Sequence, residues 1–378
     1  MPQSELSQLI EGGTMSFSFG VACFSFGYVR EVPYSFSPSD YREAVESALS
    51  SMPSVTGISV VVDDFSGSSV VTEAPIPMQD GYGLPYPSDT SISFSVYIPH
   101  RVQEELGRTI NHQSRMSCEN FRVEIIDGYE GPVAFVECVG GGRENDPAMS
   151  VFLVREYLRK HLADHKGAAV FDYMGPSPFH GHFHLDHGVG AVDAEFKLTV
   201  KSSKGYGSYI FEVGGSSVGY VELSRLYSVI SSELALYYWL IRRRTSLLEV
   251  SSKYESAWAL ARTSVDSAGI SSLWGTAARH RSIRALISDG YALQAELAVG
   301  LSEMKHAVNE EYGSGVQSYF ERNLRKVVEQ FPQVSVDPIL RWAEHVESAS
   351  YKKLEIIAVL VASIVGGLVG AAITAAVS

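Results

Sequence analysis

The stretch MSFSFGVACFSF, residues 15–26, places phenylalanine at alternate positions in each half. Successive side chains of a β-strand point to opposite faces, so this spacing predicts strand structure with an aromatic face. Residues 56–65 and 90–98 show the same apolar alternation, and residues 38–51, which precede them, have the spacing of a short helix. We therefore expect strands and helices to alternate around this stretch.

Two predicted hairpins and a predicted helix extend the pattern. Residues 121–140 read as a hairpin that turns around Asp127–Gly128, and residues 194–215 read as a second one. Residues 146–167 are amphipathic, with Asp146 at the N-cap and Pro147 at the first helical position. Residues 1–218 are therefore expected to form a mixed α/β domain with a sensor-like role.

Strand patterns stop after residue 218. Helical periodicity then covers residues 219–336, and a last helix is expected to begin near Pro338 and to run without a break to the end of the chain. The expected fold class is α+β: an N-terminal mixed α/β domain, a C-terminal long-helix domain and a stalk helix, residues 337–378, that continues into a single C-terminal transmembrane helix, residues 356–378.

The expectation of a membrane helix depends on IIAVLVASIVGGLVGAAITAAVS, residues 356–378, which contain no charge. As a helix this segment would measure about 34 Å, enough for a hydrocarbon core of about 30 Å. Lys352 and Lys353 precede it, and the N-terminus has no secretory signal. These features predict a tail-anchored, single-pass protein of the cell inner membrane. Its N-terminal domain would be cytoplasmic, and membrane lipid would be a partner.

Small residues recur along the same segment at helical spacing. Such a face lets helices approach closely, so it predicts a homo-oligomer, and several helices presenting it inward would line an ion channel. The expected packing or pore face consists of Ala362, Ser363, Gly366, Gly367, Gly370 and Thr374.

The densest group of chemically active side chains is PFHGHFHLDHG, residues 178–188. On a strand, alternation puts His180, His182, His184 and Asp186 on one side. This set is compatible with a zinc-type metal site, with a ligand pocket in which imidazoles contact phosphate or stack on a base, or with the plain polar face of a half-buried strand.

Two loops near this strand in the sequence carry cations. VGGGRENDP, residues 139–147, contains Arg143, and KSSKGYGS, residues 201–208, contains Lys201 and Lys204. We regard these three side chains as candidate ligand contacts. Neither loop has the spacing of a phosphate-binding motif. We identify no nucleophile with an evident base, so we expect a protein that is not an enzyme and leave the cofactor unknown.

The charge distribution limits which nucleic-acid ligands the protein can bind, and the cysteine spacing indicates the redox state of its thiols. The net charge is −13, and Arg30 and Arg42 are the only lysine or arginine residues among the first hundred positions. This composition argues against a broad nucleic-acid surface, although a narrow pocket can still hold a nucleotide or oligonucleotide. The three cysteines are widely spaced, which predicts free thiols. The run Arg242–Arg244 predicts a solvated helix face.

The order of these parts resembles two known layouts. A cytoplasmic α/β domain, long helices and a helix that enters the membrane directly are similar to CorA-type magnesium channels. This chain has one expected span and no Gly-Met-Asn triplet, so magnesium transport is not implied. The layout also resembles bacterial anti-phage membrane effectors, in which a nucleotide or oligonucleotide controls oligomeric membrane helices. That resemblance implies a ligand-gated effector in antiviral defence. The alternative is a tail-anchored enzyme or binding module that uses the cluster His180–His187.

Overall fold

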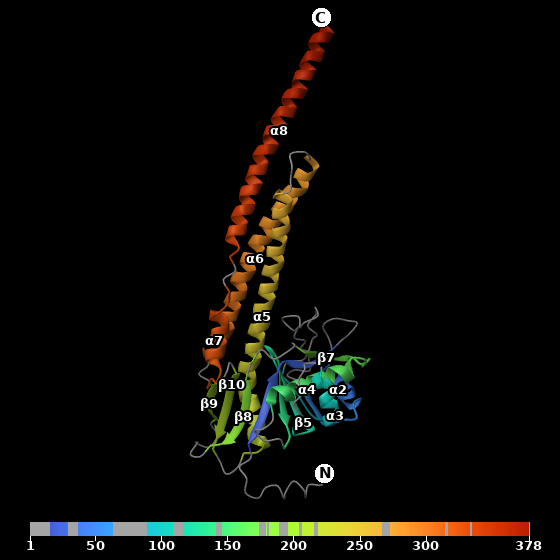
Figure 1. The fold of residues 1–378 in the computed structure, drawn as a ribbon, viewed down its shortest axis with the longest axis vertical. Coiled ribbons are helices and arrows are strands. Elements are labelled where there is room, and N and C mark those ends of the chain that lie inside the picture. The colour runs from blue at the N-terminus through green and yellow to red at the C-terminus, as the bar shows by residue number, and fades with distance from the viewer. Residues whose placement is uncertain are drawn as a thin grey trace. The chain divides into compact units, whose positions relative to one another are not determined.

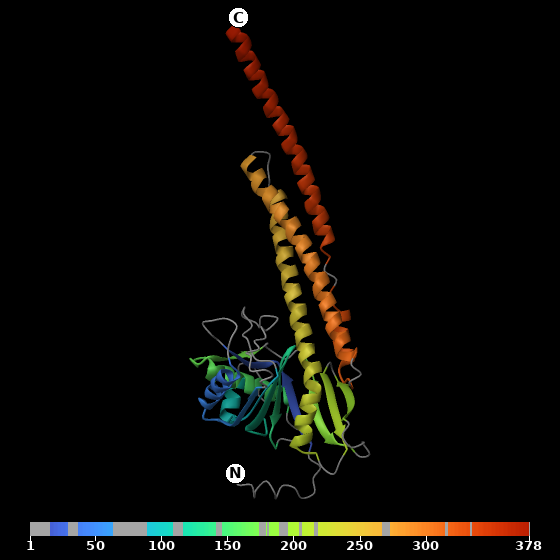
Figure 2. The same ribbon diagram turned by 180° about the vertical axis from the view of Figure 1, so that it is seen from behind.

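The structure is a computed structural model of the whole chain (Figures 1 and 2). It describes residues 16–28, 37–62, 89–108, 116–140, 146–173, 179, 181–188, 196–203, 206–214, 218–266, 273–313, 317–332 and 335–377. The chain divides into two compact units. The first comprises residues 1–242 and 308–326, and the second comprises residues 243–307 and 327–378.

The first unit is built on an eight-stranded mixed sheet in the order β3-β4-β5-β6-β1-β8-β10-β9. All neighbours in this sheet are antiparallel except β8 and β10. Its strands are β1 (Phe17–Ala22), β3 (Val55–Val62), β4 (Thr90–Tyr97), β5 (Asn120–Gly128), β6 (Gly131–Cys138), β8 (Gly181–His187), β9 (Phe196–Ser203) and β10 (Tyr206–Val213). Both predicted hairpins are confirmed, as β5–β6 and β9–β10.

One face of the sheet is covered by α2 (Pro38–Ser50), α3 (His100–Arg108), α4 (Pro147–Leu162) and the two-stranded sheet of β2 (Phe24–Tyr28) and β7 (Ala169–Tyr173). Asp146 caps α4 and Pro147 opens it, as the sequence predicts. A side chain at Gly20 in β1 would lie 2.3 Å from the Pro147 carbonyl oxygen. Glycine at this position therefore lets the start of α4 lie directly on the central strand.

The opposite face packs against the first half of α5 (Tyr220–Asp266). Tyr227 stacks on Phe135 with 4.1 Å between ring centroids, and it meets Phe19 edge-on. The phenylalanines that alternate in residues 15–26 are thus divided between two cores. Phe17 and Phe19 face α5, whereas Phe24 and Phe26 continue into β2 on the other side of the sheet.

A buried carboxylate ties the end of α6 (Leu273–Gly313) and the start of α7 (Glu321–Glu329) to α5. Glu233 of α5 is 3% exposed and accepts four hydrogen bonds. The donors are the Tyr312 and Ser318 hydroxyls at 3.0 and 3.1 Å and the backbone amides of Tyr319 and Phe320 at 2.8 and 2.7 Å. The arrangement places the Phe320 ring among aromatic side chains of β8 and β10.

The second unit consists of the second half of α5, most of α6, the end of α7 and α8 (Asp337–Val377). Its core joins Tyr254 of α5, Leu286 and Leu293 of α6, and Leu340 and Ala343 of α8. A side chain at Gly290 of α6 would lie within 2.5 Å of both the Tyr254 hydroxyl and a Leu340 methyl group. This glycine therefore permits the close approach of three helices.

α8 is one uninterrupted helix, as the sequence predicts, but the expected transmembrane helix is wrong. Within the described part of the chain, no helix combines the length and the apolar content that a bilayer crossing needs. The same finding contradicts the predictions of a single-pass location in the inner membrane, a tail anchor and an ion channel.

Two smaller expectations also change. Cys118 and Cys138 form a disulfide with 6.3 Å between their Cα atoms, and Cys23 is left as a buried free thiol. The predicted solvated face at Arg242–Arg244 does not hold for Arg242, which is only 5% exposed and donates to the Glu130 carbonyl oxygen at 2.9 Å.

We expect Glu233→Ala to lower the free energy of unfolding by about 3 kcal/mol, because it leaves buried donors without an acceptor. Thermal and urea unfolding of the full chain measure the effect. Glu255→Ala, at an exposed position of the same helix, is the matched control and should change stability little. Equal stability of the two variants would contradict the structural role of Glu233.

Candidate functional site

The predicted alternation along β8 is present. Phe183 and Leu185 are fully buried, whereas His182, His184 and Asp186 lie partly exposed on the opposite face of the strand. Neighbouring groups orient these side chains. The Ser18 hydroxyl of β1 lies 2.9 Å from His184 Nδ1, and the Ser16 hydroxyl donates to Asp186 Oδ1 at 2.8 Å.

The start of α4 completes this polar face. Asp146 Oδ1 accepts the Ala148 backbone amide at 2.9 Å and lies 3.5 Å from His182 Nε2. Because this carboxylate already caps the helix, the N-terminus of α4 is poorly suited to a phosphate. The face instead offers two imidazoles beside two carboxylates, which suits ligands that donate hydrogen bonds, such as hydroxyl and amino groups.

The other predicted contacts are less well placed. Lys201 of β9 is exposed, and Arg143, Lys204 and His180 lie outside the described residues. Across the part of the chain that the structure describes, no three His, Cys, Asp or Glu side chains gather closely enough to hold a metal ion. The described members of the predicted metal set therefore form a polar face and do not form a ligand cage.

A second cluster, which sequence reasoning missed, surrounds Asp127 at the end of β5. Asp127 is fully buried, and its Oδ2 accepts the Ser25 hydroxyl at 2.9 Å. Its Oδ1 has no hydrogen-bond partner among the described residues. Burial raises the pKa of Asp127 from 3.8 to about 8, with the Ser25 hydrogen bond opposing the shift. The carboxyl group is therefore mostly protonated at neutral pH.

The buried Cys23 thiol lies within electrostatic reach of this acid and of Arg242. Burial raises the pKa of the Cys23 thiol to about 11, Arg242 lowers it, and Asp172 and Asp127 add to the rise. The thiol is thus protonated and weakly nucleophilic. Arg242 has Nε and Nη1 without a hydrogen-bond partner among the described residues. The cluster combines a neutral acid, a thiol and a cation in a buried setting.

Another buried acid lies on the α5 side of the sheet. Glu137 of β6 is 4% exposed, and burial raises its pKa to about 7, with Arg122 acting in the opposite direction. Burial, followed by the charge of Glu137, raises the pKa of Tyr227 well above its ordinary value. Both groups lie where α5 packs on the sheet.

The predicted small-residue face of α8 is exposed where the structure describes it. Ala362, Ser363, Gly366 and Gly367 are all exposed, and the side chains of residues 368–378 lie outside the description. The Ser363 hydroxyl donates to the Val359 carbonyl oxygen at 2.8 Å. This face therefore presents little unsatisfied polarity.

Comparison of the chain with protein-family models, with curated proteins and with solved structures gave no match.

We expect Asp127→Asn to stabilise the protein increasingly as the pH rises. The folded state holds a proton on Asp127 between about pH 4 and pH 8 that the unfolded chain lacks. The stability from this group is therefore present below pH 4 and is lost as the pH rises through 8. Asparagine stays neutral throughout, so its advantage over wild type should be small near pH 5. Near pH 9 it should reach at least about 2 °C in melting temperature.

Melting temperatures measured between pH 5 and pH 9 test this expectation. Asp164→Asn, at an exposed position of the same unit, is the control and should show no gain that depends on pH. Glu137 titrates alike in all three proteins, so the difference between them isolates Asp127. A constant difference across this pH range would contradict a buried, protonated Asp127.

Proposed function

We propose that the chain is a homo-oligomeric effector in which the C-terminal part of α8 joins copies of the protein. The observation that carries this proposal is that α8 continues well beyond the helix against which it packs. In Figure 1 the last part of α8 extends past the ends of α5 and α6, its neighbours in the second unit.

Side-chain contacts define where that packing ends. Three side chains of α6 donate hydrogen bonds to carboxylates of α8. The pairs are Gln294 with Asp337, Tyr291 with Glu344, and Arg284 with Glu347. α6 and α8 are therefore antiparallel, so successive residues of α8 lie opposite residues of α6 with decreasing numbers. The first residue of α6, Leu273, consequently lies opposite roughly Leu360. The remainder of α8 has no neighbour from α6.

The unpaired part of α8 is apolar. Val359, Leu360, Val361, Ile364 and Val365 are 53–60% exposed. A run of exposed apolar side chains of this kind marks an interaction site, because leaving it in water forgoes the free energy of burial. A short isolated helix is also marginally stable without a packing partner. Both considerations favour burial of this segment against a partner in the functional protein.

A second copy of the same segment is the partner that its chemistry suits. Residues 356–378 carry no charge, while the chain as a whole has a net charge of −13. Most other surfaces of the chain would therefore bring charged groups against this segment, and burying an unpaired charge is costly. Gly366 and Gly367 have no other atoms within 4 Å of the position of a side chain, so a neighbouring helix could approach closely.

Control by a small molecule is the other part of the proposal. From the resemblance to anti-phage effectors we retain ligand-controlled assembly, with a nucleotide or oligonucleotide that is held through its base and sugar as the ligand. Conduction is dropped with the membrane span. The polar face of β8 supports a ligand that is held by its hydroxyl or amino groups. The Asp146 and Asp186 carboxylates accept such donors, whereas they repel phosphates.

Size-exclusion chromatography with light scattering tests the assembly. We expect Gly366→Leu to lower the association constant of the oligomer at least about tenfold, because a leucine at this position obstructs close approach of the helices. The substitution meets no atom of its own chain, so the effect reports contacts between copies. Gly313→Leu, another substitution into open space at the end of α6, is the control and should leave the mass unchanged.

A change of polarity gives an independent test. Val365→Glu should shift the protein toward the monomer, because it places a charge in the proposed interface. Val299→Glu on α6 is matched, since Val299 and Val365 are both 54% exposed. A wild-type protein that is monomeric at micromolar concentration would overturn the proposal. So would equal behaviour of the two variants.

Equilibrium dialysis with adenosine and AMP tests the ligand class. We expect adenosine to bind at least as well as AMP, because the carboxylates disfavour the phosphate. Asp186→Asn should weaken adenosine binding, whereas the exposed Asp164→Asn should not. Failure of both compounds to bind, or binding of AMP alone, would contradict a nucleoside site on β8 and would leave the assembly result unaffected.

A further inference from the structure

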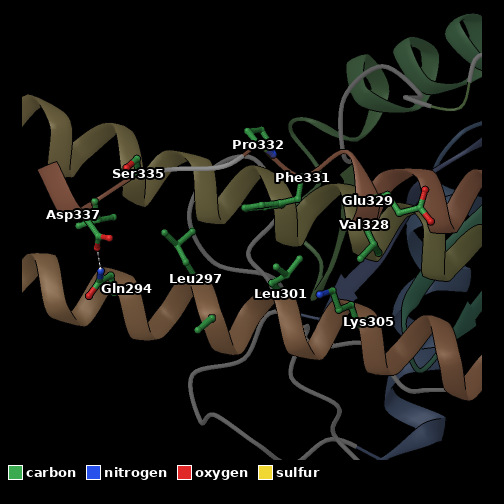
Figure 3. A pocket seen from close by; sticks show the side chains of 12 residues that line it. Gln294, Leu297, Leu301, Lys305, Val328, Glu329, Phe331, Pro332, Ser335 and Asp337 are labelled. Atoms are coloured by element: carbon green, nitrogen blue, oxygen red, sulfur yellow. Dashed lines mark hydrogen bonds between the residues drawn. The ribbon is translucent and has the colours of Figure 1, made fainter.

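A cavity of about 680 Å³ lies in the second unit, beside the start of α8. Cavities that bind small molecules usually measure about 300–1,000 Å³. One wall is a face of α6, and the other is formed by the end of α7, residues 331–332 and residues 335–337 at the start of α8 (Figure 3). All of the lining residues belong to the second unit.

The middle of the lining is apolar. Leu297 and Leu301 are four residues apart on α6, so they share one face of that helix. Val328, Phe331 and Val336 form the opposing wall. A polar molecule would gain little from these surfaces, whereas a hydrocarbon chain would be removed from water on both sides.

The two ends of the cavity differ in polarity. At one end the Gln294 amide donates to the Asp337 carboxylate, so these groups partly satisfy each other. At the other end the Lys305 ammonium lies beside Leu301 and Val328, toward the cavity. The Glu329 carboxylate points away from the cavity in the same view. Lys305 forms no ion pair with the residues that line the cavity.

The geometry points to a single-chain apolar anion, such as a medium-chain carboxylate, as the molecule that this cavity binds. Its head group would pair with Lys305, the only cation of the lining, and its chain would lie between Leu297, Leu301 and Phe331. Lys305 and Gln294 are about 16 Å apart along α6, which leaves room for an extended decanoate chain. This site does not depend on the proposed assembly of α8.

Isothermal titration of the full chain, below the micellar concentration of each compound, tests the inference. The probes are decanoate, decyl phosphate, decan-1-ol and decyltrimethylammonium. We expect at least one of the two anions to bind about tenfold more tightly than the alcohol, since a charge-assisted contact is lost with the head group. The cation should bind more weakly still. Which anion binds distinguishes a carboxylate head group from a phosphate.

Two variants assign the binding to this cavity. Lys305→Met should lower the affinity for the anion about tenfold and leave that for the alcohol unchanged. Leu301→Trp should weaken both by filling the space. Lys253→Met, at an exposed position on α5, is the control and should bind like wild type. Circular dichroism confirms that each variant is folded.

Three results would overturn the inference: equal affinity of the anions and the alcohol, unchanged anion binding by Lys305→Met, or unchanged binding by Leu301→Trp.

Discussion

The Glu233 carboxylate fixes the path of the chain through the first unit. The chain leaves that unit within α5, forms most of the second unit, and returns at residue 308. The four hydrogen bonds to Glu233 anchor the returning segment on α5, and they place Phe320 among the rings of β8 and β10. Without this acceptor, two hydroxyls and two backbone amides would be buried without their partner. The aromatic core between α5 and strands β8 and β10 therefore rests on an interaction between segments that are far apart in sequence.

Local patterns predicted the local elements. The alternation along β8, the capping of α4 by Asp146, and both hairpins follow from spacing and turn chemistry, and the structure confirms them. The buried acid could also have been found this way. Asp127 continues the inward series Phe121, Val123, Ile125 along β5, so its position alone marked it as facing the core. The sequence does not reveal Ser25 as its partner, because that contact spans the two sheets.

Other features could not be derived from one segment at a time. Arg242 reads as part of a solvated cationic run, yet the β5–β6 turn covers it and accepts its hydrogen bond. The cysteines are twenty positions apart, but the β5–β6 pairing brings Cys138 beside the start of β5 and within reach of Cys118. The apolar end of α8 predicted a membrane helix because hydropathy indicates that a segment tends to be buried. It does not indicate whether lipid or protein buries it. The cavity at Lys305 depends on the packing of α6 against a distant connection, and no spacing within either segment predicts it.

The position of β1 has a consequence for synthesis of the protein. β1 is the first strand among the described residues, and it lies between β6 and β8, which begin at Gly131 and Gly181. At about 5–20 residues per second, the ribosome needs roughly 8 to 33 seconds to add both neighbours. During that time the neighbouring strands of this segment have not been synthesised, and its four phenylalanines, Phe17, Phe19, Phe24 and Phe26, lack their packing partners. A nascent chain that exposes an aromatic strand edge for this long is prone to aggregation until the neighbouring strands are made.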